Sequence, residues 1–171
     1  MSTGRRAFPA CVLFLAMATS LPAAELKYWV QSGPDADLAQ WAIEAWQSAS
    51  QGKLKLQRVQ SRDQAAIRVF WVTGREGLYG ETNGRDIHVR LEPGAGLRRD
   101  AIVYLTCLHE VGHALGLSHT AEFADIMYNF QYGGDLDEYF GRYVRKLKIR
   151  EDIRRNSGLS PNDEKRLAAG L

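Results

Sequence analysis

Three of the four histidines in this 171-residue chain lie within eleven residues, in the segment HEVGHALGLSH at positions 109–119. On a helix, His109 and His113 are one turn apart on the same face, so both imidazoles can reach one ion. A helix that continued to His119 would carry that residue about 15 Å along the axis from His109, out of reach of the same ion. The chain must therefore turn back. Gly116 is placed to end the helix, because glycine adopts the left-handed conformation at little steric cost.

Three imidazoles with an open fourth position indicate a catalytic zinc site, because a structural zinc site is closed by four protein ligands. Glu110 lies beside the first ligand but is rotated around the helix, so its carboxylate can serve as a general base without binding the metal. Convergent histidines on a half-buried helix would be costly without a metal. We therefore predict one catalytic Zn²⁺ ion bound by His109, His113 and His119, with Glu110 as the catalytic residue.

The first 24 residues have the three-part layout of a secretory signal peptide, with two arginines, an apolar run over residues 10–18 and small residues at Ala23 and Ala24. The apolar run is shorter than the roughly 20 residues that span a bilayer. We expect residues 1–24 to be cleaved and residues 25–171 to form a single catalytic domain that is secreted or periplasmic. The alternative is an uncleaved anchor. No other segment is long and apolar enough to span a membrane, so we expect no integral membrane segment after cleavage.

Removal of residues 1–24 also changes the charge balance. The formal charge of +2 becomes zero, because the segment contains Arg5 and Arg6 and no acidic residue. The basic pI of 8.6 is thus no evidence for a nucleic-acid partner, and we expect none. Cys11 is lost with the segment, which leaves Cys107 as a lone thiol. Core packing and a metal must then stabilise the domain, which we expect to be a monomer.

Hydrophobic periodicity gives a coarse order of elements for the rest of the chain. Strands are predicted over residues 26–30, 54–59 and 66–72, and the last of these is apolar enough to suit a strand covered on both faces. Residues 78–81 and 86–91 form a probable type I′ hairpin around Asn83–Gly84. Helices are predicted from Asp35 to about Ala49, over residues 100–115, and from Ser160 onward. This order describes an α+β fold, with a mixed sheet and helices packed against it.

The eleven-residue segment matches the extended zinc motif of the metzincins, HExxHxxGxxH, and residues 125–128 (DIMY) stand where that clan has its Met-turn. Within the clan the chain resembles a matrixin. Met127 is followed directly by Tyr128, whereas astacins and serralysins place a zinc-binding tyrosine two residues after the methionine. Residues 159–163 (LSPND) also resemble the start of the last matrixin helix. The resemblance extends from about Leu26 to the C-terminus, and residues 109–128 are its most specific part.

The resemblance implies a metzincin-like catalytic domain, with a twisted mixed sheet of about five strands, an antiparallel edge strand, an active-site helix, a Met-turn and a C-terminal helix. It implies that Met127 forms a floor under the zinc ligands and that Tyr128 lines a substrate pocket. Leu78, Tyr79 and Gly80 would lie on the edge strand that pairs with an extended substrate. The alternatives are that Met127 is an ordinary core methionine and that Tyr79 only covers the sheet.

Two features depart from the family pattern. Vertebrate matrixins carry a second, structural zinc ion; only His88 resembles one of its ligands, so we predict no second zinc. Residues 131–157 look like a helical insertion, with apolar residues at helical spacing and a basic far side. We interpret that basic side as a helix face exposed to solvent. The alternative is that it contacts acidic polymers or lipid headgroups.

These observations favour a secreted zinc-dependent endopeptidase acting on protein or peptide substrates. Zinc would polarise the scissile carbonyl, and Glu110 would take a proton from water and deliver it to the leaving amine. One alternative is a non-catalytic, zinc-stabilised binding module, although such a module has no need of a base beside the metal. Another is a zinc amidase acting on cell-wall peptides, which would share the site and differ in the shape of its cleft.

Overall fold

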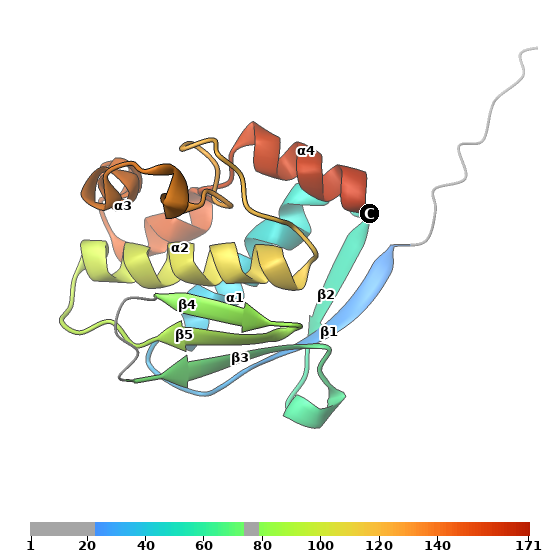
Figure 1. Cartoon of the computed structure of the whole chain (residues 1–171). Coiled ribbons are helices and arrows are strands. Elements are labelled where there is room, and N and C mark those ends of the chain that lie inside the picture. Colours follow the sequence, from blue (N-terminus) through green and yellow to red (C-terminus); the bar gives the residue numbers. More distant parts are fainter. Residues whose placement is uncertain (1–22, 74–78) are drawn as a thin grey trace, which may run out of the picture.

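The computed structural model describes residues 23–73 and 79–171 (Figure 1). Most of the predicted signal peptide, and Leu78, lie outside the described residues. The backbone N–H of Ala24 donates to the Lys53 carbonyl, so regular pairing begins at the predicted signal boundary. Five strands follow: β1 (Ala24–Val30), β2 (Leu54–Arg58), β3 (Ile67–Val72), β4 (Gly80–Asn83) and β5 (Asp86–Arg90).

The five strands form one mixed sheet in the order β2-β1-β3-β5-β4. The pairs β1–β2, β1–β3 and β3–β5 are parallel, and the edge strand β4 is antiparallel to β5. The register aligns apolar side chains on one face: Val69 pairs with Ile87, and both are fully buried. The predicted α+β class, with a five-stranded mixed sheet and an antiparallel edge strand, is confirmed.

Two details of the predicted strands are wrong. The hairpin pairs Asn83 with Asp86, so Gly84 and Arg85 form the turn, one residue later than predicted. Only Gly84 has a positive φ angle, +62°, which does not fit the type I′ turn expected around Asn83–Gly84. Strand β3 is also not buried on both faces: Ile67 and Val69 are fully buried, whereas the residues of the other face are half-buried, with Phe70 lying beside the rings of Trp29 and His88.

Helices α1 (Ala36–Ala49) and α2 (Leu97–Ala114) pack against each other and against the sheet (Figure 1). Helix α2 begins three residues earlier than predicted and lies next to β4 and β5. The indole N–H of Trp46 on α1 donates to the carbonyl of Leu108 on α2 at 2.8 Å, and Trp46 is fully buried. This contact fixes α1 behind the half of α2 that carries the predicted zinc ligands.

Residues 131–157 are helical as predicted, and contain α3 (Leu136–Val144) and the 3₁₀ helix η3 (Arg150–Arg155). The apolar side chains at helical spacing in this segment pack on the domain, and four of them are buried: Tyr139, Phe140, Tyr143 and Leu147. The final helix α4 (Pro161–Gly170) starts with Ser160 and Asp163 in a capping box, also as predicted. The shorter 3₁₀ segments are η1 (Arg62–Gln64) and η2 (Phe130–Tyr132).

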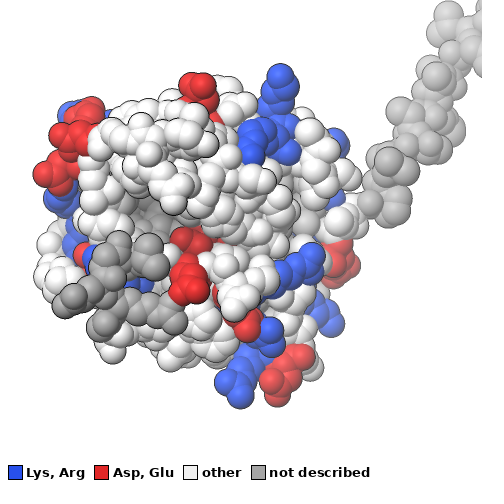
Figure 2. Space-filling view, viewed as in Figure 1, with Lys and Arg blue, Asp and Glu red and all other residues white. Residues whose placement is uncertain are grey.

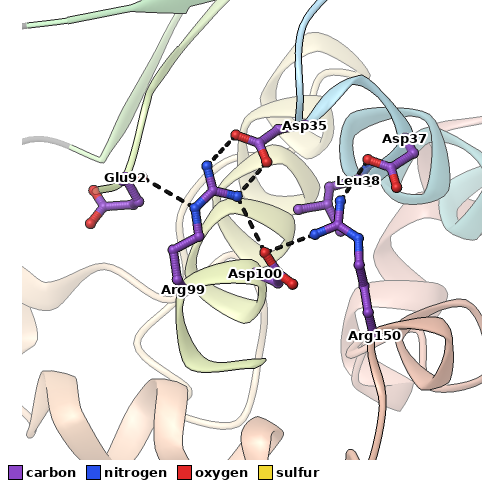
Figure 3. Close-up of polar contacts among 7 residues, drawn as sticks. All are labelled: Asp35, Asp37, Leu38, Glu92, Arg99, Asp100 and Arg150. Carbon is purple, nitrogen blue, oxygen red and sulfur yellow. Dashed lines mark hydrogen bonds and ion pairs between the residues drawn. The ribbon is translucent and has the colours of Figure 1, made fainter. Parts of the chain in front are cut away.

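A cluster of ion pairs joins η3 to the N-terminal ends of α1 and α2 (Figure 3). Arg99 binds both carboxylate oxygens of the buried Asp35, the N-cap residue of α1, and also contacts Asp100. Arg150 lies 2.7 Å from both Asp37 and Asp100. The three carboxylates lie at or near helix N-termini, where the helix dipole favours negative charge.

The basic side chains of residues 131–157 are largely neutralised within the molecule. Beyond Arg150, Arg145 pairs with Glu138, Arg154 with Glu44, and Arg155 with Asp152. Figure 2 shows acidic and basic side chains interspersed around the rim of this face, with further acidic side chains near its middle. This agrees with a solvated face. Within residues 23–73 and 79–171, no helix is both long and apolar enough to cross a membrane.

Candidate metal centre

The three predicted zinc ligands come together where α2 ends. His109 and His113 lie on α2, and the chain then turns at Gly116, whose φ is +94°. The N–H of Gly116 donates to the His113 carbonyl and that of Leu117 to the Gly112 carbonyl, each at 2.9 Å. This pair of bonds is a Schellman motif, which ends the helix and turns the chain back. His119 thereby reaches the other two histidines, as the spacing predicted.

Main-chain oxygens fix the orientation of the two helical imidazoles. Nδ1 of His109 lies 2.6 Å from the Ile126 carbonyl, and Nδ1 of His113 lies 2.8 Å from the Leu117 carbonyl. A carbonyl oxygen only accepts hydrogen bonds, so both Nδ1 atoms must carry the proton. In the neutral ring, Nε2 is then left with its lone pair. Burial lowers the pKa of His109 to about 4, which keeps this ring neutral at pH 7.

The Nε2 atoms of all three rings face one another. Nε2 of His119 lies 3.2 Å from that of His109 and 3.1 Å from that of His113, and the possible ligand atoms all lie within 4.8 Å of one another. His119 can offer at most one proton to two lone pairs, so hydrogen bonds alone cannot satisfy this arrangement. A cation at the centre would satisfy it. Three neutral nitrogen donors that leave a fourth position open fit a catalytic zinc ion.

The segment that carries His119 is paired with the Met-turn. The N–H of Thr120 donates to the Met127 carbonyl at 2.8 Å, and the N–H of Asn129 donates to the Thr120 carbonyl at 3.0 Å. The side-chain amide of Asn129 also lies 3.2 Å from Nδ1 of His119. The most exposed of the three histidines is therefore held by main-chain pairing on one side and by an amide on the other.

Met127 lies beneath α2 at the level of the two helical ligands. Its side chain is fully buried and its sulfur packs on Gly112, the residue before His113. A β-carbon at Gly112 would overlap the sulfur and would come within 3.1 Å of Trp46. Met127 thus packs directly beneath the helix turn that carries two of the predicted ligands, and its role as a floor under a metal stays a prediction.

Glu110 lies beside the three histidines and is only 7% exposed. Its carboxylate Oε2 accepts a hydrogen bond from the Thr82 hydroxyl at 2.7 Å. The pKa of Glu110 is raised, mainly by burial, while the Thr82 bond and the nearby His113 and His119 act in the opposite direction. A carboxyl group whose pKa is shifted toward neutrality is suited both to accept and to return a proton.

The predicted substrate-binding residues have different surroundings. Tyr79 is half-buried, with its ring edge-on to Phe140 and beneath Arg90. Tyr128 is buried among aromatic rings and donates to the Gly133 carbonyl at 2.8 Å. Gly80 packs directly against Glu110. A role in substrate binding stays a prediction for these residues.

Two further side chains, His88 and Cys107, lie outside the cluster of three histidines. His88 stacks on Phe70, with ring centroids 5.2 Å apart, and the absence of a second zinc stays a prediction. Cys107 is fully buried, and burial raises the pKa of its thiol. It packs as a small apolar side chain.

Sequence reasoning missed several supporting groups: Thr82, Asn129, Asp163 and the carbonyls of Leu117 and Ile126. Carbonyl groups are present at every residue, so no residue type marks the two that orient the imidazoles. Thr82 had a usable signal: it lies two residues after Gly80, one residue beyond the predicted strand 78–81, and it shares the face of Gly80 once the strand is extended to Asn83.

The chain was compared with a protein-family model and with solved structures. Residues 95–138 match the model of the matrixin family. Archaemetzincin from Methanopyrus kandleri is a similar solved structure, with 15% identity, coverage of 88% of this chain and 96% of that chain, and a TM-score of 0.48. Myroilysin is another, with 19% identity, coverage of 86% and 74%, and a TM-score of 0.41.

A search of curated proteins gave no match. The matrixin match covers α2, all three histidines and the Met-turn. The chain is thus matrixin-like over the segment that builds its candidate metal centre, as its motif predicted, and this match supports a zinc-dependent peptidase.

Proposed function

We propose that this protein is an exported zinc-dependent endopeptidase in which Glu110 is the general base. The observation that carries the proposal is the convergence of three Nε2 atoms beside a buried carboxylate. His109, His113 and His119 would bind the zinc ion. The match to the matrixin model over residues 95–138 supports the same chemistry.

When bound, zinc supplies Lewis acidity, which polarises a carbonyl group and acidifies a water molecule. Glu110 takes a proton from the attacking water and returns it to the leaving amine. The hydrogen bond from Thr82 holds the carboxylate while its charge changes, and burial keeps bulk water from competing for the proton. The carbonyls of Ile126 and Leu117 keep the two helical imidazoles in the tautomer that a metal requires.

The proposal of export rests on residues 1–24, which have the layout of a signal peptide. Expression in a secreting host followed by N-terminal sequencing tests it. A product that begins near Glu25 supports export with cleavage, whereas a secreted or membrane-bound product that retains Met1 contradicts cleavage and favours the uncleaved anchor.

The peptidase is tested by digesting a diverse peptide mixture with the zinc-loaded protein and identifying new termini by mass spectrometry. We expect internal cleavage that a chelator abolishes. Glu110→Gln should retain zinc and lose cleavage, whereas His113→Ala should lose both. Glu122→Gln makes the same chemical change at an exposed position and should cleave normally. Undiminished cleavage by Glu110→Gln would contradict the proposed role of this carboxylate. If the wild-type protein binds zinc but cleaves no peptide, a binding module is favoured instead.

A further inference from the structure

The edge strand β4 presents alternate residues to α2 beside the metal centre. Gly80 and Thr82 are half-buried, whereas Glu81 and Asn83 are exposed. The hairpin register pairs Gly80 with Val89 and Thr82 with Ile87, and both partners are fully buried beneath α2. Cross-strand partners lie on the same face of a sheet, so Gly80 and Thr82 both face α2.

The Thr82 hydroxyl contacts Glu110 twice. Its oxygen lies 2.7 Å from the carboxylate Oε2 and 3.0 Å from the main-chain oxygen of Glu110. A hydroxyl has one proton, and a charged carboxylate is the stronger acceptor of the two. Thr82 therefore donates to Oε2, and the main-chain oxygen of Glu110 can share that single proton only as the weaker acceptor.

Gly80 restricts the same side chain from another direction. A β-carbon at position 80 would lie 2.8 Å from Cγ and 3.0 Å from Oε1 of Glu110. It would also lie 2.7 Å from a methyl group of Thr106. The observed conformation of Glu110 thus exists only because position 80 has no side chain. The two inward-facing positions of β4 together define where the carboxylate lies.

We propose that Thr82 is the positioning residue for Glu110 in peptide hydrolysis, and that Gly80 provides the space in which Glu110 is held. This inference rests on the proposed peptidase function. By occupying Oε2, the Thr82 hydroxyl fixes the rotamer of Glu110 and leaves Oε1 to exchange protons with water and the leaving amine. Thr82 itself touches none of the three histidines among the contacts described, so its removal should affect the chemical step and spare metal binding.

The test compares Thr82→Val, which keeps the branched shape and removes the hydroxyl, with Thr82→Ser, which keeps the hydroxyl. The purified zinc-loaded proteins are assayed on one peptide that the wild-type protein cleaves, and kcat and KM are determined separately. Bound zinc and the thermal midpoint are measured on the same samples. Thr73→Val makes the same chemical change at an exposed residue after β3 and serves as the matched control.

We expect Thr82→Val to lower kcat about tenfold to a hundredfold, with KM within about twofold and zinc content unchanged. Thr82→Ser should retain kcat within about threefold, because it restores the donor. Full kcat in Thr82→Val, or equal losses in both variants, would overturn the positioning role. If the wild-type protein itself cleaves nothing, or Glu110→Gln cleaves as well as wild type, the proposed peptidase mechanism fails instead, so the two failures are distinguishable.

Discussion

The carboxylate of Asp163, on α4, accepts a hydrogen bond from the backbone N–H of Ile126 in the Met-turn at 2.8 Å. The carbonyl of the same Ile126 accepts from Nδ1 of His109. Asp163 is fully buried and also accepts from the backbone N–H groups of Ser160 and Met127. One side chain in the last helix thus supports the peptide that orients a metal ligand 54 positions earlier in the chain.

Asp163→Ala should destabilise the fold and weaken metal binding. It leaves buried N–H donors in the Met-turn without an acceptor, at a cost of roughly 2–4 kcal/mol in the free energy of unfolding. Loss of support behind His109 should also lower zinc affinity about tenfold or more. Urea unfolding and a competitive zinc titration measure the two effects. Glu164→Ala, at an exposed position on the same helix, should change neither. Unchanged zinc affinity in a folded Asp163→Ala protein would refute the link to His109.

Gly112→Ala should disturb the floor beneath the zinc ligands. Its β-carbon would overlap the Met127 sulfur and lie 3.1 Å from Trp46, so either the Met127 side chain or α2 itself must shift. We expect a loss of about 1–3 kcal/mol of stability, as overpacking of a core usually causes, together with weaker zinc binding. Gly170→Ala, where no atom lies within 4 Å of the added carbon, is the control. Equal unfolding midpoints for the two variants would contradict this packing.

The sequence predicted the parts of this molecule that depend on periodicity and fixed spacing. His109, His113, Gly116 and His119 converge as their spacing required, and the α4 capping box follows from Ser160 and Asp163. The parts it did not predict depend on contacts between distant main-chain segments. Nothing in the composition of residues 120–129 shows that a carbonyl there meets His109.

The errors have the same origin. The hairpin turn moved by one residue because Asn83 takes part in the ladder, and strand pairing outweighs the local preference of an Asn-Gly pair. Strand β3 was expected to be covered on both faces because its residues are apolar, but one face is only half-buried, and Phe70 there lies beside the rings of Trp29 and His88 from neighbouring strands.

The metal-free protein should lose stability on mild acidification through His109. Burial lowers its folded pKa to about 4, against about 6.5 in the unfolded chain. Between these pH values the unfolded chain binds the extra proton, so stability falls as the pH decreases from about 6.5 toward 4. The loss attributable to this group grows as the pH decreases and reaches about 3 kcal/mol only below about pH 4, so part of it is expressed at pH 5.

Urea unfolding at pH 7, 6 and 5 in the presence of a chelator measures this dependence. His109→Asn keeps a donor for the Ile126 carbonyl and does not titrate in this range, so its stability should change less with pH. Parallel curves for the variant and the wild-type protein would show that His109 does not cause the dependence.

Two adjacent arginines on α2 allow a matched test of the ion-pair cluster in Figure 3. Arg99 is 15% exposed and pairs with Asp35, which is 1% exposed, whereas Arg98 and its partner Asp137 are 50% and 86% exposed. Arg99→Met should cost about 3 kcal/mol or more, because it leaves a buried carboxylate without its cation. Arg98→Met should change stability little, as exposed pairs are screened by water.

The double variant Arg99→Met, Asp35→Leu separates the pair from the penalty of an unpaired charge. Replacing both partners with apolar side chains should recover much of the loss, since buried ion pairs contribute little net stability over apolar packing. Thermal unfolding of the four proteins gives the comparison. If the double variant is no more stable than Arg99→Met, the cluster stabilises the junction of η3 with α1 and α2 through its hydrogen bonds and geometry, and not only by neutralising Asp35.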